Sequence, residues 1–357
     1  MTAAGPEVRH TAFLDRDGRP LQDLPEKLSR PEILHGLYGD MVRARVFDAK
    51  AIELHRTGRL GTYASLLGQE AIGVGVGHAM SSEDVLLPSF REHAVQLKRG
   101  VSLTELFLYW GGDERGSDFA VPREDFPVSI TVGGHAPHAA GVALAFKLRG
   151  EPRVAVCMFG DGATSKGDFY EAMNVAALWD LPLVFVVSNN QWAISTPRRE
   201  QTAAASLAQK SIAAGFEGEQ VDGNDVIAVA SVMAGALADA RLGSGPRLIE
   251  CLTYRLGDHT TVDDARRYRS DAEVEEWREQ DPIRRLRSYL TAQGEWSEGQ
   301  EAELIARCEA EVDRAAEDYL ATPPQAPESM FDSLYAELPV PLRAQREALL
   351  AAGGGSD

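Results

Sequence analysis

Three short and almost continuous apolar segments constrain the fold of this chain more than any other feature. They are RVAVCMF (153–159), LPLVFVV (181–187) and PRLIECLTY (246–254). Segments with helical patterns, such as DFYEAMNVAALW and NDVIAVASVMAGALADARL, separate them. Strands that are apolar throughout are buried on both faces, and their alternation with helices is typical of a parallel sheet. We therefore predict an α/β fold in which helices cover both faces of a parallel sheet.

The remaining chain divides into parts of different character. Residues 1–28 are rich in proline, glycine and charge, which indicates an extended N-terminal arm lying on the protein or on a partner. Residues 29–270 carry the sheet pattern and form the expected main domain. Residues 271–340 are charged and helical, and we interpret them as a C-terminal extension of that domain. Residues 341–357 form a tail, and we expect its end, AAGGGSD, to be disordered.

Charge and composition exclude several classes of partner. The 357 residues carry a formal net charge of −18, which repels nucleic acid and anionic lipid. Neither a signal peptide nor a membrane-spanning stretch is recognisable, so we expect no membrane partner and a cytoplasmic location. The three cysteines are scattered and odd in number, which disfavours both a zinc cluster and a closed disulfide framework.

Polar residues follow two of the apolar segments. The first segment is followed by GDG at 160–162, and the second leads to NN at 189–190. A right-handed crossover would bring Asp161 and Asn190 together at the carboxyl edge of the sheet, where ligands of such sheets bind. An acid and an amide supply oxygen ligands suited to magnesium or calcium, and the glycines let a large anion approach the backbone. This arrangement predicts a site for a metal-bound diphosphate.

These motifs also have plainer interpretations. GDG alone is more often a turn, and NN alone is more often a strand end. Gly162 and Gly167 have the spacing of a Walker A loop, but Asp168 stands where that loop needs lysine. The glycines within 73–77 imitate a dinucleotide-binding fingerprint poorly, because no strand leads into them. Arg91 follows a short strand that we predict in DVLLP, ending at Pro88, and it suits either an anionic ligand or a surface salt bridge.

Taken together, the motifs resemble those of a known family. GDG followed after 26 residues by NN is similar to the thiamine diphosphate signature. NNQWAISTP, QVDGNDVIAV and DPIRRLRSYL resemble the alpha subunit of the first component of 2-oxo acid dehydrogenase complexes. The similarity runs from GTYASLLGQEA to SMFDSLYAELP, with bacterial pyruvate dehydrogenases most similar and the branched-chain type close behind. The resemblance implies that residues 29–270 form a thiamine diphosphate-binding domain.

The resemblance also implies roles for individual residues. The metal would be Mg²⁺, bound by the side chains of Asp161 and Asn190 and by the carbonyl of Trp192. Arg91 would hold the diphosphate beside Phe90, where many relatives have tyrosine, so that a hydroxyl contact is absent. The other implied cofactor contacts are the backbone of Gly160, Gly162 and Ala163, the walls Val132 and Ile194, and His259.

His259 lies in the polar segment YRLGDHTTVDDARRYRS and matches an active-site histidine on a loop over the channel mouth. We expect it to act as a catalytic residue, because a cation is favoured near a diphosphate and a reacting carboxylate. Thr260 matches a position where some mitochondrial relatives carry a regulatory phosphoserine. His135 and His138 are interpreted as packing or supporting groups.

The implied function is thiamine diphosphate-dependent oxidative decarboxylation of a small 2-oxo acid, with pyruvate first, followed by reductive acylation of a lipoyl group. The implied partners are a beta subunit, in an α₂β₂ heterotetramer, and the lipoyl-bearing acyltransferase second component. The alternatives are a branched-chain 2-oxo acid or acetoin dehydrogenase alpha subunit. A noncatalytic regulatory subunit that retains the fold is a further alternative of a different class.

Overall fold

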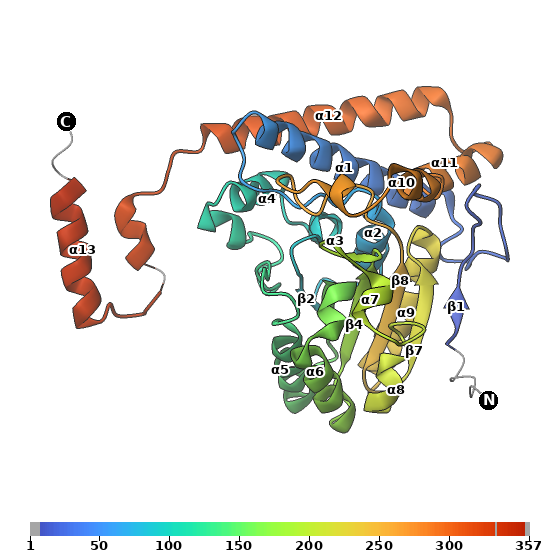
Figure 1. Ribbon diagram of the computed structural model, residues 1–357, viewed down its shortest axis with the longest axis horizontal. Coiled ribbons are helices and arrows are strands. Elements are labelled where there is room, and N and C mark those ends of the chain that lie inside the picture. Colours follow the sequence, from blue (N-terminus) through green and yellow to red (C-terminus); the bar gives the residue numbers. More distant parts are fainter. Residues whose placement is uncertain (1–7, 333, 354–357) are drawn as a thin grey trace.

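The computed structural model describes residues 8–332 and 334–353, which are built around a six-stranded sheet (Figure 1). Every neighbouring pair of strands is parallel, and the strand order is β1-β7-β8-β4-β3-β2. The strands are β1 (His10–Thr11), β2 (Val85–Leu87), β3 (Ala155–Gly160), β4 (Leu183–Asn189), β7 (Gly218–Asp222) and β8 (Arg247–Leu252). The three strands predicted from the apolar segments, β3, β4 and β8, lie side by side in the middle.

Helices cover both faces of the sheet, because successive side chains of each central strand enter different cores. Val156 and Met158 of β3 point into one core, whereas Cys157 and Phe159 point into the other. The first core is covered by α2 (Glu70–Ala79), α3 (His93–Arg99) and α9 (Val226–Arg241), and the second by α5 (Ala136–Arg149) and α6 (Gly167–Leu178). The predicted α/β fold class is therefore confirmed.

Further helices surround this framework. The long helices α1 (Pro31–Arg56) and α12 (Glu298–Ala321) pack against each other over the first core (Figure 1). The other helices are α4 (Leu103–Trp110), α7 (Arg198–Gln201), α8 (Lys210–Ala214), α10 (Asp271–Arg278), α11 (Pro282–Ala292) and α13 (Val340–Gly353). A short hairpin joins β5 (Trp192–Ala193) to β6 (Thr196–Pro197). Among the residues described, no helix has the length and apolar character needed to cross a membrane.

The N-terminal segment adds the edge strand β1, which the sequence pattern did not predict. Thr11 donates a hydrogen bond to Glu219 of β7 at 2.6 Å. Asp225 anchors the same segment, because its Oδ2 accepts hydrogen bonds from the amides of Phe13 and Leu14 at 2.7 and 2.8 Å. The other oxygen of Asp225 caps the start of α9. Strand β7 was also missed, since its sequence GEQVD is mostly polar.

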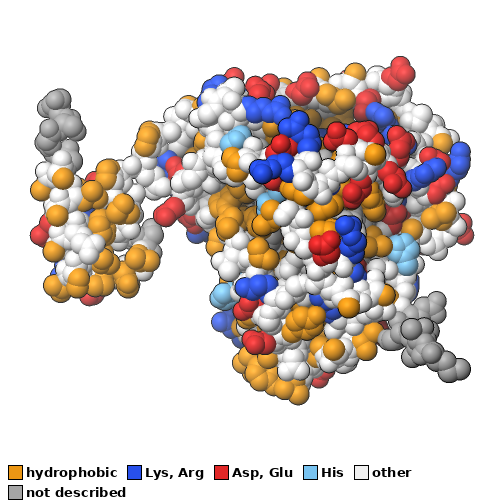
Figure 2. Space-filling model, viewed as in Figure 1, with side chains coloured by type: hydrophobic (Ala, Val, Ile, Leu, Met, Phe, Trp, Pro, Cys, Tyr) orange, Lys and Arg blue, Asp and Glu red, His pale blue; other side chains and the backbone are white. Residues whose placement is uncertain are grey.

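The C-terminal segment extends away from the sheet. After α12 the chain forms the short turn η4 (Pro327–Phe331) and then α13, and the two stand apart from the body of the molecule (Figure 1). Figure 2 shows apolar side chains on this extension, and Met330, Leu334 and Val340 are among its exposed residues. The expectation of disorder for AAGGGSD was wrong for residues 351–353, which form the end of α13, and residues 354–357 lie outside the described part of the chain.

Candidate cofactor site

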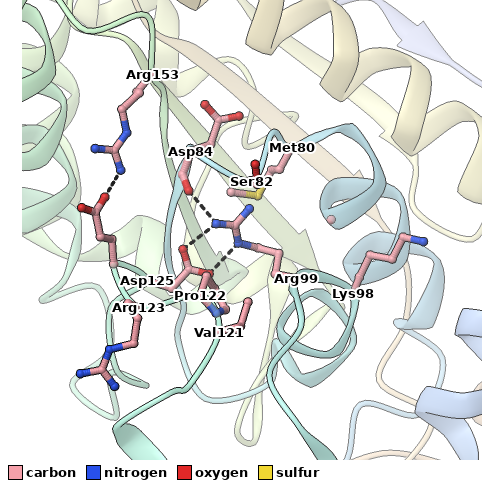
Figure 3. A pocket seen from close by; sticks show the side chains of 12 residues that line it. Met80, Ser82, Asp84, Lys98, Arg99, Val121, Pro122, Arg123, Asp125 and Arg153 are labelled. Atoms are coloured by element: carbon pink, nitrogen blue, oxygen red, sulfur yellow. Dashed lines mark hydrogen bonds and ion pairs between the residues drawn. The ribbon is translucent and has the colours of Figure 1, made fainter.

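One cavity, of about 360 Å³, lies beside β2 and is lined by four cationic side chains (Figure 3). Arg99 is enclosed by the carboxylate of Asp125, at 2.6 Å, and by the backbone carbonyl of Asp84. The other three cations are also paired with carboxylates: Arg153 with Glu124, Lys98 with Asp40, and Arg123 with Asp118. Because its cations are already neutralised, we interpret this cavity as part of a structural ion-pair network.

A second cavity, of about 590 Å³, opens at the carboxyl ends of β3 and β4. Parallel pairing aligns Gly160 of β3 with Ser188 of β4, so the residues after both strands meet at one edge. All eleven site residues predicted from the sequence line this cavity: Phe90, Arg91, Val132, Gly160, Asp161, Gly162, Ala163, Asn190, Trp192, Ile194 and His259. They come from loops that are far apart in the sequence but converge at this edge.

Asp161 and Asn190 are both buried in this cavity. The side chain of Asp161 accepts a hydrogen bond at Oδ2 from Nε2 of Gln201 at 2.5 Å. Asp161 is only 1% exposed, and burial raises the pKa of its carboxyl to about 6 despite that hydrogen bond. Asn190 donates from Nδ2 to Gln69 at 3.1 Å, and its Oδ1 accepts the backbone amide of Trp192 at 3.2 Å while keeping room for one further partner. A buried carboxylate beside an amide oxygen fits a hard divalent cation.

The turn after Asn190 has an unusual backbone that is held from outside. Gln191 and Ile194 adopt positive φ angles of 71° and 55°, which are costly for residues with a side chain. The buried guanidinium of Arg255 donates to the carbonyl of Ile194 at 2.9 Å and to that of Trp192 at 3.4 Å. Arg255 thereby fixes the turn that carries the proposed carbonyl ligand of Trp192.

Glycine is required in the loop that follows β3. A Cβ atom added to Gly162 would lie 2.7 Å from the Cβ of Ala193, closer than unbonded carbon atoms can approach. Gly160, in contrast, has no atom within 4 Å of an added Cβ. The backbone of this loop therefore packs closely against β5 on one side and borders the cavity on the other, as a cradle for a large anion requires.

Arg91 and His259 meet at another wall of the cavity. Nη2 of Arg91 donates to the backbone carbonyl of His259 at 2.8 Å, and the ring of Phe90 packs edge-on against the imidazole at 5.8 Å. Burial, together with the nearby charge of Arg255, lowers the pKa of Arg91 to about 10, so it stays charged at neutral pH. Arg91 is thus a fixed cation at the cavity wall, suited to an anionic ligand.

His259 differs from the expected cation. Burial and the charges of Arg91 and Arg255 lower its pKa to about 4, so the imidazole is neutral at pH 7. Its Nδ1 lies 3.3 Å from Nη2 of Arg91 and 3.4 Å from Nη1 of Arg255, and both of these groups can only donate. Nδ1 is therefore the acceptor, and the ring proton resides on Nε2. In the chain alone the two guanidiniums already supply the positive charge, and an imidazolium beside a bound diphosphate stays a prediction.

The loop around His259 is held by a polar network. Asp263 accepts hydrogen bonds from the backbone amide of His259, at 3.0 Å, and from the hydroxyl of Tyr268. The same hydroxyl accepts a hydrogen bond from Arg255 at 2.6 Å. Arg269 donates to the carbonyl of Gly257 at 2.6 Å. Thr260 also lines the cavity from this loop.

Sequence reasoning missed three residues that organise the site: Gln69, Gln201 and Arg255. Gln69 lies in the segment GQEA, whose following glycines drew attention instead. Gln201 and Arg255 lie far along the chain from the GDG motif, which gives no guide to them, since only the folded loops bring these side chains to the site. His135 is buried and contacts the carbonyl of Met158 at 2.9 Å, whereas His138 is exposed.

The fold and the site together define a parallel α/β protein in which an acid, an amide and a glycine-containing loop line one cavity at the carboxyl edge of the sheet. The chain belongs to the Dehydrogenase E1 component family, which it matches over residues 38–328. This match confirms the resemblance that the motifs indicated.

Two relatives illustrate the range of this family. The chain is 43% identical over 347 residues to the 3-methyl-2-oxobutanoate dehydrogenase subunit alpha of Mycobacterium tuberculosis, covering 97% of this chain and 92% of the relative. It is 41% identical over 337 residues to the pyruvate dehydrogenase E1 component subunit alpha of Staphylococcus epidermidis, covering 94% and 91%. The two names differ in the 2-oxo acid that they specify.

Proposed function

We propose that this chain is the alpha subunit of a thiamine diphosphate-dependent 2-oxo acid dehydrogenase. The enzyme would oxidatively decarboxylate a 2-oxo acid and reductively acylate the lipoyl group of an acyltransferase second component. The observation that carries this proposal is the convergence of Asp161 and Asn190 at the sheet edge, in a chain that belongs to the Dehydrogenase E1 component family. This complete acid-amide pair disfavours a noncatalytic regulatory subunit.

The residues of the cavity suit the cofactor and its metal. Asp161, Asn190 and the carbonyl of Trp192 would hold Mg²⁺, which would satisfy the buried carboxylate that accepts a hydrogen bond from Gln201. When bound, thiamine diphosphate supplies a nucleophilic carbon and accepts the electrons released as the 2-oxo acid loses CO₂. The protein would supply binding, orientation and a low-dielectric environment.

The other residues would orient the diphosphate and the reacting end. Arg91 would offer the fixed positive charge, and the backbone around Gly162 and Ala163, which lines the cavity, would approach the anion closely. The neutral imidazole of His259 would donate a hydrogen bond through Nε2, because its Nδ1 faces two guanidinium groups. Val132 and Ile194 would form apolar walls.

A beta subunit would complete the site in an α₂β₂ heterotetramer. Ile130 and Ile194 line the cavity, yet they are 60% and 56% exposed, and Val132, which also lines it, is 43% exposed. Exposed apolar surface around a cofactor cavity favours cover by another chain. We propose that the covering chain is the beta subunit, and that the acyltransferase reaches the same opening with its lipoyl group.

Pyruvate is the first candidate substrate. A branched 2-oxo acid is the alternative, since a relative named for 3-methyl-2-oxobutanoate is as similar as one named for pyruvate. Acetoin is the remaining alternative. A panel of these substrates, assayed with an artificial electron acceptor on the chain co-expressed with its neighbouring beta subunit, distinguishes among them. A correctly assembled complex that turns over none of the 2-oxo acids would overturn the proposed function.

Asp161→Ala tests the cofactor site directly. We expect it to abolish Mg²⁺-dependent binding of thiamine diphosphate, because the metal loses its only charged side-chain ligand. Calorimetric titration of the co-expressed complex measures this binding. Asp168→Ala is the matched control, since Asp168 is near in sequence but pairs with Lys166 at 3.4 Å, at the surface. Unchanged cofactor affinity in Asp161→Ala would remove Asp161 from the metal site.

A further inference from the structure

Gln201 contacts Asp161 from a segment that follows the cofactor motif in the sequence. It is the last residue of α7, and its Nε2 donates to Oδ2 of Asp161 at 2.5 Å and to the carbonyl of Thr196 at 3.1 Å. Both partners can only accept, so the nitrogen and the oxygen of this amide are assigned by chemistry. Ser165 strengthens the contact between the two segments by donating to the carbonyl of Gln201 at 3.2 Å.

The other end of the same amide has no partner. Oε1 of Gln201 is buried and accepts no hydrogen bond among the residues that the structure describes. A buried acceptor without a donor is unfavourable, and such atoms are rare unless a water, an ion or a ligand completes them. This orphan oxygen belongs to the amide that already holds the carboxylate of Asp161. It therefore needs a donor that the described residues do not provide.

We propose that Gln201 is a positioning residue for the metal ligand Asp161. Its Nε2 fixes Oδ2, so that Asp161 uses its other oxygen, Oδ1, for the ion, and its Oε1 accepts a hydrogen bond from a water bound to that ion. This inference rests on the proposed function, because it concerns the Mg²⁺ that accompanies thiamine diphosphate. Outer partners of this kind orient metal ligands and tune metal affinity.

The main chain of Asp161 is held from the same segment. Lys210, which is only 5% exposed, donates from Nζ to the carbonyl of Thr164 at 2.6 Å and to its hydroxyl at 3.0 Å. The hydroxyl of Thr164 in turn donates to the carbonyl of Asp161 at 2.7 Å. Residues 196–210 thus contact the side chain of Asp161 through Gln201 and its backbone through Thr164, so the two contacts hold different parts of the residue.

The location of Gln201 in a short surface helix distinguishes a role in metal binding from a role in folding. Helix α7 has four residues and none of them is buried, so it adds little to the hydrophobic core. Replacing Gln201 should therefore weaken metal binding more than it weakens folding. Gln201→Met keeps the length of the side chain but removes both polar atoms. Gln209→Met is the matched control, because Gln209 lies on the same segment and its side chain bonds only the amide of Ala205, at 3.2 Å.

The experiment uses the complex of the chain with its beta subunit, at a saturating concentration of thiamine diphosphate. Calorimetric titration with MgCl₂ and electron paramagnetic resonance with Mn²⁺ report the metal affinity, and turnover is measured as a function of Mg²⁺. For Gln201→Met we expect a metal affinity about 10- to 100-fold weaker, with turnover restored at high Mg²⁺. For Gln209→Met we expect wild-type metal affinity. Gln201→Asn, whose amide is too short to reach Asp161, should behave as Gln201→Met and serves if the Met variant does not fold.

Two results would overturn the inference while leaving the proposed function intact. One is a wild-type metal affinity in both Gln201 variants. The other is a loss of turnover that saturating Mg²⁺ does not restore, since that indicates a role in folding or chemistry rather than in metal positioning. If the wild-type complex itself binds neither Mg²⁺ nor thiamine diphosphate, the proposed function fails first and the inference falls with it.

Discussion

His259 shows how one side chain is set by its neighbours. Arg91 and Arg255 direct donors at its Nδ1, and together with burial they hold the pKa of the imidazole at about 4. The pKa of His259 in the folded protein therefore lies below its unfolded value of 6.5. At any pH between these two pKa values, the histidine binds fewer protons in the folded protein than in the unfolded chain. Folding is then favoured above pH 6.5, and this contribution is lost as the pH falls toward 4.

We therefore predict a difference between the wild-type chain and His259→Asn that depends on pH. Asparagine keeps a hydrogen-bonding group but does not titrate. Between about pH 7.5 and about pH 5 the unfolding temperature of the wild-type chain should fall more than that of the variant, and thermal denaturation at both pH values measures this. His138→Asn is the control, because His138 is exposed. An equal fall in His259→Asn and the wild-type chain would show that His259 is not held neutral.

At the scale of elements, the loop from 257 to 269 depends on the hydroxyl of Tyr268. This hydroxyl joins Arg255, at 2.6 Å, to Asp263, which in turn holds the amide of His259. Tyr268→Phe should cost about 1 kcal/mol and loosen the loop, because one hydroxyl serves both partners. Limited proteolysis should then cut within 257–269 faster than in the wild-type chain. Tyr289→Phe on α11 is the control, and equal cleavage rates in the two variants would contradict this role.

The elements also show what the sequence could and could not predict. Strands β3, β4 and β8 were predictable because their side chains are buried on both faces and leave continuous apolar segments. Strands β1 and β7 were not, since β7 is largely polar and the two-residue β1 forms only by pairing with it. The site was predictable where topology or the family motif determines it, as for Asp161 and Asn190. Gln201 was not, because its contact depends on how the loop after β6 folds back.

At the scale of the whole molecule, one sheet accounts for all of the described strands except the short β5–β6 hairpin. The proposed cofactor has two ends, and this sheet provides a site for the diphosphate end. The described chain after β8 is helical apart from loops, so no second sheet follows to enclose the other end. Apolar side chains remain exposed both beside the cavity, at Ile130 and Ile194, and on the extension around α13. Surface of this kind favours burial against another subunit.

We predict that the chain alone does not decarboxylate 2-oxo acids and gains activity only with its beta subunit. Thiamine activation needs a carboxylate against the aminopyrimidine ring in an enclosed pocket, and in this family we assign that group to the beta chain. Turnover of the purified chain, shown by mass spectrometry to be free of other proteins, is compared with that of the co-expressed complex on the same 2-oxo acids. The complex should be active and the chain alone inactive, because its cavity stays open to water on the side of Ile130 and Ile194. Enzyme-like rates from the chain alone would show that one subunit completes the site, and the heterotetramer would then have to be abandoned.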